Sequence, residues 1–89
     1  MTASEQRRLG TVSIIVYKPD RVYQKINELL HEYSRIIIGR LGVPYKERSV
    51  SVIALIVDGT TDEVGALTGK LGQLESVSVR TSLARQNDV

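Results

Sequence analysis

The side chains that could carry out chemistry are few. The 89 residues contain one histidine, His31, and no cysteine. Zinc, nickel and iron sites in proteins usually need several imidazole or thiolate ligands. The sequence also offers no recognisable Ser-His-Asp or Cys-His arrangement for nucleophilic catalysis. We therefore predict no catalytic residue, no metal and no cofactor, and we expect that the protein is not an enzyme.

A second group of reactive side chains is acidic. Asp58, Asp62 and Glu63 gather around the start of an expected helix, where paired carboxylates could serve as a general acid and base. However, the positive end of a helix dipole favours acids at that place. Thr60 and Glu63 also have the spacing of a capping box. We interpret this cluster as structural.

The most unusual segment is the glycine-rich stretch at residues 65–72. Glycine costs about 1 kcal/mol relative to alanine inside a helix, so Gly65 and Gly69 need a reason. They lie four residues apart and share one helix face with Thr68 and Gly72. Close packing against the first helix, the sheet or a second subunit is the favoured interpretation, and backbone contact with a small ligand is the alternative. In the second case, Gly65, Thr68, Gly69 and Gly72 are the candidate ligand-binding residues.

Six elements should position these groups. Alternating or continuous runs of β-branched residues predict strands, and apolar residues at spacings of three and four predict helices. Asp20 and Gly42 are expected to cap the first helix. Pro44 cannot donate to a ladder, so a strand there belongs at a sheet edge. The predicted order is strand 11–17, helix 20–41, weak strand 43–46, strand 49–57, helix 61–71 and strand 77–83.

This order predicts an α+β, ferredoxin-like βαββαβ domain, in which two helices cover one face of an antiparallel sheet. The first and third strands should be central, because both are apolar on both faces. No element is left to cover the second sheet face, which we expect to contain Ile15, Tyr17, Ile53, Leu55 and Val57. Such a large apolar patch is rare on monomers. We therefore predict a homo-oligomer, a dimer or a dimer of dimers, with these residues at its interface.

Composition sets the remaining bounds. We expect an N-terminal arm at residues 1–8, one domain at 9–84 and a tail at 85–89. No apolar run approaches the ~20 residues of a membrane span, and we expect a cytoplasmic protein. The 12 basic and 10 acidic residues give a net charge of +2 without a basic cluster. The alternative function, a small DNA-binding or co-repressor protein with a basic arm, needs one continuous basic face formed by Arg7, Arg8, Lys18, Arg80 and Arg85.

Several stretches resemble a small bacterial family, the regulators of the iron-only hydrogenase system. They are Tyr23, 27–31, 40–45, 47–48, 58–59 and 62–72, of which the glycine-rich string is the most specific. The resemblance implies an ACT-like fold similar to the ligand-binding domain of the nickel-responsive repressor, an oligomer, and a role in hydrogenase expression or maturation. It does not imply metal sensing, because that repressor uses several histidines. The sequence has no ribbon-helix-helix segment, so we expect no direct DNA contact. The expected function is a non-enzymatic regulatory module that binds a small molecule or a partner protein.

Overall fold

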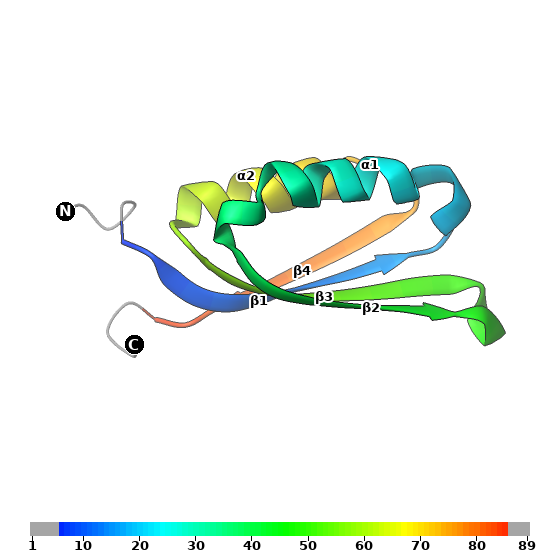
Figure 1. Cartoon of the computed structure of the whole chain (residues 1–89), viewed down its shortest axis with the longest axis horizontal. Coiled ribbons are helices and arrows are strands. Elements are labelled where there is room, and N and C mark those ends of the chain that lie inside the picture. Colours follow the sequence, from blue (N-terminus) through cyan, green and yellow to red (C-terminus); the bar gives the residue numbers. More distant parts are fainter. Residues whose placement is uncertain (1–5, 86–89) are drawn as a thin grey trace.

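The computed structural model describes residues 6–85, in which four strands form one antiparallel sheet beneath two helices (Figure 1). The spatial strand order is β2-β3-β1-β4. Both helices lie on the same face of the sheet, which confirms the predicted ferredoxin-like α+β fold. The elements are β1 (Arg8–Val16), α1 (Pro19–Glu32), β2 (Ile37–Tyr45), β3 (Val50–Gly59), α2 (Thr61–Gly72) and β4 (Val77–Leu83), with short 3₁₀ turns at Ser34–Ile36 and Lys46–Arg48.

The two central strands are β1 and β3, as predicted, and their register decides which side chains form the core. Ile14 lies opposite Ile53, and Val12 lies opposite Leu55. Directly opposed residues of an antiparallel pair point to the same side of a sheet. Ile53 and Leu55 are therefore buried under the helices with Val12 and Ile14. Both helices contribute to this core, chiefly through Val22, Ile26, Leu30, Val64, Leu67 and Leu71.

The assignment of Ile53, Leu55 and Val57 to the uncovered sheet face is therefore wrong. All three are buried in the core, and the uncovered face of β3 presents Val52, Ala54 and Ile56 instead. Both sets are apolar, so the alternation of residue types did not reveal which one faces the helices. A shift of one residue in register exchanges the two faces completely.

The first helix is shorter than predicted. It ends at Glu32, and the chain continues through the 3₁₀ turn into β2, so Gly42 lies within a strand and caps no helix. The β-branched run Ile36-Ile37-Ile38, followed by Gly39, disfavours helix and suits a strand. At the start of the helix, the N-cap is Lys18 without a side-chain cap, Pro19 occupies the first turn, and Asp20 is a first-turn acid rather than the cap. The β2 strand is an edge strand, as Pro44 required.

The second helix agrees with its prediction. The Thr60 hydroxyl accepts a hydrogen bond from the Glu63 amide at 3.1 Å, and the Glu63 carboxylate accepts one from the Thr60 amide at 2.9 Å. These reciprocal bonds are the predicted capping box. At its other end α2 continues through Gly72, one residue beyond the predicted end, and Gln73 is the C-cap residue.

Two polar contacts connect the helices to each other and to the loop after α1. Arg35 forms an ion pair with Glu63 at 2.5 Å, and Lys70 forms one with Glu32 at 3.0 Å. The Lys70 ammonium also lies 5.0 Å from the centre of the Tyr33 ring. Within residues 6–85, no helix is long and apolar enough to cross a membrane. The predicted arm and tail fall largely on residues 1–5 and 86–89, outside the described residues.

Candidate functional site

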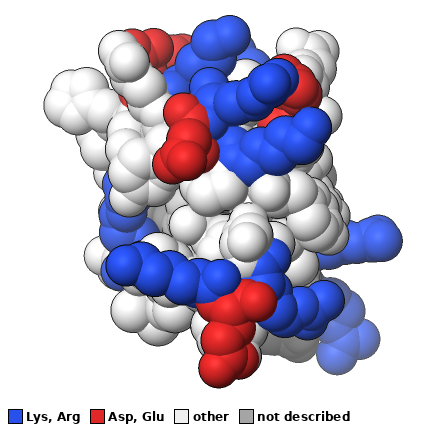
Figure 2. Space-filling view, turned by 90° about the vertical axis from the view of Figure 1, so that its right-hand side faces the viewer, with Lys and Arg blue, Asp and Glu red and all other residues white. Residues whose placement is uncertain are grey.

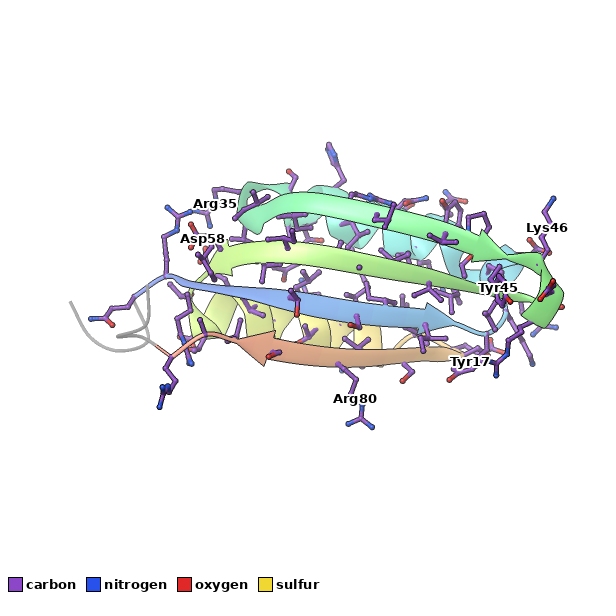
Figure 3. The ribbon with its side chains drawn as sticks, turned by 90° about the horizontal axis from the view of Figure 1, so that it is seen from below. Tyr17, Arg35, Tyr45, Lys46, Asp58 and Arg80 are labelled. Carbon is purple, nitrogen blue, oxygen red and sulfur yellow. The ribbon has the colours of Figure 1, made fainter. Side chains whose placement is uncertain are left out.

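The uncovered face of the sheet is the first candidate surface. It is seen directly in Figure 3, where the helices lie behind the strands. Most large apolar side chains exposed in residues 6–85 belong to it, among them Leu41 at 65% exposure and Ile56 at 52%. The register of the sheet aligns Leu41 with Ala54 and Val43 with Val52. The open face, as we call it, consists of Leu9, Thr11, Ser13, Ile15, Tyr17, Leu41, Val43, Tyr45, Val52, Ala54, Ile56, Ser78, Arg80 and Ser82.

Charge on the open face is confined to its margins. Arg7 and Asp58 form an ion pair at 2.6 Å near one end. Arg80 lies on β4 at one side (Figure 3), between Ser78 and Ser82. Polar and apolar side chains alternate along much of β4, as is typical of a strand with one face in water. Between these margins the central strands present mainly apolar side chains and small polar ones. This arrangement of an apolar centre and a polar margin is typical of protein interfaces.

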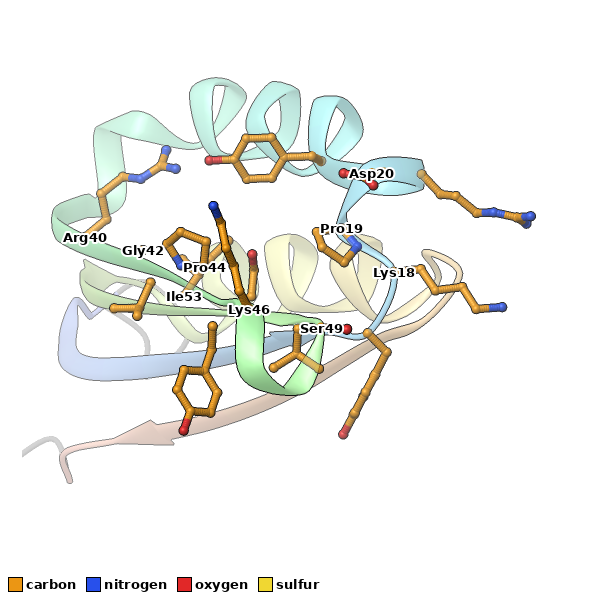
Figure 4. A pocket seen from close by; sticks show the side chains of 16 residues that line it. Lys18, Pro19, Asp20, Arg40, Gly42, Pro44, Lys46, Ser49 and Ile53 are labelled. Carbon is orange, nitrogen blue, oxygen red and sulfur yellow. The ribbon is translucent and has the colours of Figure 1, made fainter.

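The second candidate is a pocket of about 800 Å³ at the opposite end from the Arg7–Asp58 pair. It lies between the start of α1 and the end of the β2–β3 hairpin, which we call the hairpin pocket (Figure 4). Gly42, Pro44 and Ile53 line it from the sheet, and Pro19 and Asp20 line it from the helix. Ser49, in the left-handed conformation at φ 56°, ends the 3₁₀ turn that reverses the hairpin.

Basic side chains dominate the charged groups of the hairpin pocket. Lys18, Arg21, Arg40 and Lys46 contribute to its lining, whereas Asp20 is the single acid among the lining residues. Arg40 and Lys46 extend from the hairpin toward α1, while Lys18 points away (Figure 4). Viewed onto this end of the molecule, basic side chains, with acidic ones among them, lie above and below a largely uncharged middle (Figure 2). A cavity with this lining attracts anions.

The predicted ligand-binding residues lie elsewhere. Gly65, Gly69 and Gly72 are exposed on the outer side of α2, and a Cβ atom added to any of them would meet nothing within 4 Å. The Thr68 hydroxyl donates to the Gly65 carbonyl at 3.3 Å. Packing of these glycines against the first helix or the sheet, one part of the favoured explanation, is therefore wrong. Packing against a second subunit and contact with a ligand at this face stay predictions.

The residues considered for catalysis have structural surroundings. His31 is exposed in the last turn of α1. Asp58 pairs with Arg7, and Glu63 caps α2 and pairs with Arg35. The hydrogen bond from the Thr60 backbone lowers the pKa of Glu63. Burial opposes this effect, and the Thr60 hydroxyl and Arg35 add to it. Among residues 6–85 there is no group of three or more His, Cys, Asp or Glu side chains that could hold a metal ion.

The basic residues required by the DNA-binding alternative are dispersed. Arg7 is paired with Asp58, and the Arg8 side chain donates to the Ala84 carbonyl at 2.7 Å. Lys18 lies beyond the other end of β1, roughly 30 Å away for a nine-residue strand. Arg80 is opposite Ser13, about halfway along the edge strand β4. This separation does not provide the compact basic face that the alternative needs.

Two solved structures of low sequence identity share the ferredoxin-like fold of this chain. One is described as a "putative glycine cleavage system transcriptional repressor", with a TM-score of 0.66 and 9% identity over 93% of this chain and 49% of that one. Another is CPII from Thiomonas intermedia K12, a nitrogen regulatory PII-like protein, with a TM-score of 0.50 and 17% identity over 86% of this chain and 91% of that one. At these identities the likeness concerns the fold alone.

The family is defined by closer matches. Residues 8–81 match the family described as "TM1266-like: Iron-only hydrogenase system regulator, putative". The structure of the uncharacterized protein TM1266 from Thermotoga maritima superposes with a TM-score of 0.86 and 36% identity, over 90% of this chain and 100% of that one. A search of curated proteins found no match. The chain belongs to the TM1266-like family, as the sequence resemblance predicted.

Proposed function

We propose that this protein is a non-enzymatic regulatory module of the iron-only hydrogenase system that works as a homo-oligomer and binds a small molecule. Membership of the TM1266-like family supports the regulatory role. The observation that carries the proposal is the open face, on which Leu41, Val43, Val52 and Ile56 are exposed on a surface that no helix of residues 6–85 covers. Contiguous apolar surfaces of this kind mark interaction sites on soluble proteins.

A second copy of the chain is the proposed occupant of the open face. A two-fold dimer joins the same patch of two subunits, so the patch must be complementary to itself. The centre of the open face meets this condition because it is apolar and has no charge that would be buried against its own copy. The charged groups nearby, the Arg7–Asp58 pair and Arg80, lie at the margins, where they can remain hydrated. Small domains often gain needed stability from such association.

The hairpin pocket supports the binding part of the proposal. Its lining combines tyrosine, lysine and arginine side chains with backbone at Gly42 and contains neither histidine nor cysteine. Such a lining can hold an anionic ligand, but it offers no nucleophile paired with a general base. The chemistry of this pocket therefore favours recognition over turnover.

The assembly is tested by replacing Ile56 with Asp. A charge buried without a partner in an interface costs several kcal/mol, so Ile56→Asp should convert a dimer or higher multiple at micromolar concentration into a folded monomer. Ile38→Asp is the matched control. Ile38 has a similar exposure of 60%, against 52% for Ile56, but lies on the helix side near Asn27 and His31.

Sedimentation velocity gives the mass of each variant, and circular dichroism checks its fold. The proposal predicts that the Ile38 variant stays associated while the Ile56 variant does not. A monomeric unmodified protein at high concentration, or equal association of both variants, would overturn the choice of a second copy as the occupant. Leu55 is unsuitable as a probe because it is fully buried in the core, so its replacement by Asp would unfold the subunit itself.

A further inference from the structure

Three of the four tyrosines of the chain lie around the hairpin pocket, Tyr23 on its helix side and Tyr17 and Tyr45 at its rim, where it meets the open face. Tyr17, Tyr23 and Tyr45 line it and are 52%, 49% and 43% exposed. They come from the end of β1, from α1 and from the end of β2, so the fold rather than the sequence makes them neighbours. The sequence has no Phe and no Trp, and the fourth tyrosine, Tyr33, lies beside Lys70 between the helices. Tyr23 therefore offers an exposed aromatic ring on the same side of the sheet as Arg40 and Gly42, where it can stack on a planar ring.

Two positive charges face the same cavity without an acidic partner. Arg40 donates to the neutral Asn27 side-chain carbonyl at 3.2 Å, which orients its guanidinium and leaves its charge uncompensated. Lys46 forms no ion pair within the described part of the chain. By contrast, Arg21 pairs with Glu75 at 3.3 Å. The acid next to Lys46 in sequence, Glu47, accepts a hydrogen bond from the Tyr45 hydroxyl at 2.8 Å.

Gly42 keeps the floor of the pocket open. A Cβ atom at this position would meet only the Ile53 side chain, at 4.0 Å, and the backbone of Gly42 does not have a positive φ. Neither packing nor backbone conformation therefore demands glycine here. Strands disfavour glycine because it adds flexibility and no packing surface. What glycine provides at this position is space in front of β2, between Arg40 and Pro44.

We propose that the hairpin pocket binds a small organic anion that carries a planar ring, with Arg40 and Lys46 holding the anionic group and Tyr23 contacting the ring. Arg40 suits a phosphate or carboxylate because its planar fork donates two parallel hydrogen bonds to either group. Lys46 adds a mobile charge from the hairpin turn. This inference rests on the proposed small-molecule binding and names the class of ligand and its site.

The experiment uses four probes in calorimetry with the full chain. Adenosine monophosphate carries a ring and a phosphate, salicylate carries a ring and a carboxylate, and adenosine and inorganic phosphate each carry one feature only. We expect saturable binding of at least one ring-bearing anion and much weaker binding of adenosine and phosphate. Preference for the nucleotide identifies a phosphate ligand, and preference for salicylate identifies a carboxylate.

Variants separate the contributions of charge and space. Arg40→Gln and Lys46→Gln should each weaken binding roughly tenfold, the usual effect of removing one charge-assisted hydrogen bond. Gly42→Val should abolish binding by filling the pocket, while the subunit keeps its stability. Lys25→Gln is the matched control, because Lys25 is an exposed cation of α1 outside the pocket lining.

Several outcomes would overturn this assignment. These are the absence of saturable binding below about 1 mM, equal binding of phosphate alone, and unchanged affinity in the Gly42 and Arg40 variants. Tight binding that requires a single-stranded oligonucleotide would replace the small anion by a nucleic acid. Sedimentation of the same samples keeps the two proposals apart. A protein that associates but binds no probe refutes the pocket assignment alone, whereas a monomer that binds a probe refutes the open-face assembly alone.

Discussion

Replacement of Gly69 by alanine tests how the glycine-rich face of α2 is used. In the single subunit this face is exposed, and a Cβ atom on Gly69 would meet nothing within 4 Å. The substitution therefore adds no collision and removes the conformational cost of glycine in a helix. We expect Gly69→Ala to stabilise the protein.

The magnitude follows from helix propensity. Glycine in a helix interior is about 1 kcal/mol less favourable than alanine, and Gly69 is flanked by helical residues on both sides within Thr61–Gly72. For a domain of this size, 1 kcal/mol corresponds to a rise in Tm of roughly 4–8 °C. Gly65→Ala should have a similar effect for the same reason. The gain at Gly72 should be smaller, because it is the last residue of the helix.

Urea unfolding at several protein concentrations measures the effect. Ala66 provides the matched control, since it is an exposed neighbour on the same helix, and Ala66→Gly should cost about 1 kcal/mol. The m-value should stay unchanged, which would show that the native and denatured states expose the same surface as before.

Destabilisation by Gly69→Ala would refute this reasoning for the free subunit. If the loss appeared only at concentrations where the protein is associated, the glycine face would be packed against another copy. Overpacking of that kind typically costs about 1–3 kcal/mol. If the loss were independent of concentration, the space beside Gly69 would have to be filled within the subunit itself.

Two further substitutions test the packing of β1 and the cap of α2. Gly10→Ala should lower Tm, because a Cβ atom there would collide with the Ser82 carbonyl oxygen and the Leu83 side chain. Gly39→Ala should not lower Tm, because a Cβ atom at Gly39 would meet nothing within 4 Å. Thermal unfolding of dilute samples compares the two variants, and equal Tm values would contradict the predicted collision. Because its pKa is lowered in the folded state, Glu63 should stabilise the protein above its unfolded pKa of about 4.3. That contribution should disappear as the pH falls from there through the folded pKa. Glu63→Gln should flatten the stability profile in this range, and an unchanged acid limb would contradict the role given to the carboxylate.

Local signals in the sequence were sufficient for much of the fold. The capping box at Thr60 and Glu63, the buried positions of α2 and the wet side of β4 all follow from short-range patterns, and the structure contains them. The order of elements then determined the fold class. The failure at the end of α1 was also local, because Ile36, Ile37 and Ile38 fit a helical spacing as well as a strand. The β-branched run itself was the signal for a strand, and the glycine after it disfavoured a longer helix.

That single error hid the hairpin pocket. Arg40 and Gly42 were assigned to the end of a helix and not to a strand of the hairpin, so their approach to Tyr23 and Lys46 could not be foreseen. The rim of the pocket is also formed by Tyr17, just after β1, and by Tyr45, at the end of β2, which come near each other only after the sheet has formed. Short-range patterns cannot predict that these side chains come together, because this depends on how far β2 and β3 extend past the start of α1 in the folded domain.

The open face required a different kind of information. On β1, Thr11 and Ser13 mark the solvent side clearly, whereas β3 is apolar on both sides. The polarity of β1 can be transferred to β3 only through the register, in which Thr11 meets Ile56 and Ser13 meets Ala54. Ile56 therefore lies beside polar neighbours on the uncovered side, and Leu55 lies beside Val12 in the core. An apolar residue with a polar cross-strand neighbour, on a face that no helix covers, has no structural role within the subunit. Association with another chain gives Ile56 such a role, which is why this residue is the sharpest probe of assembly.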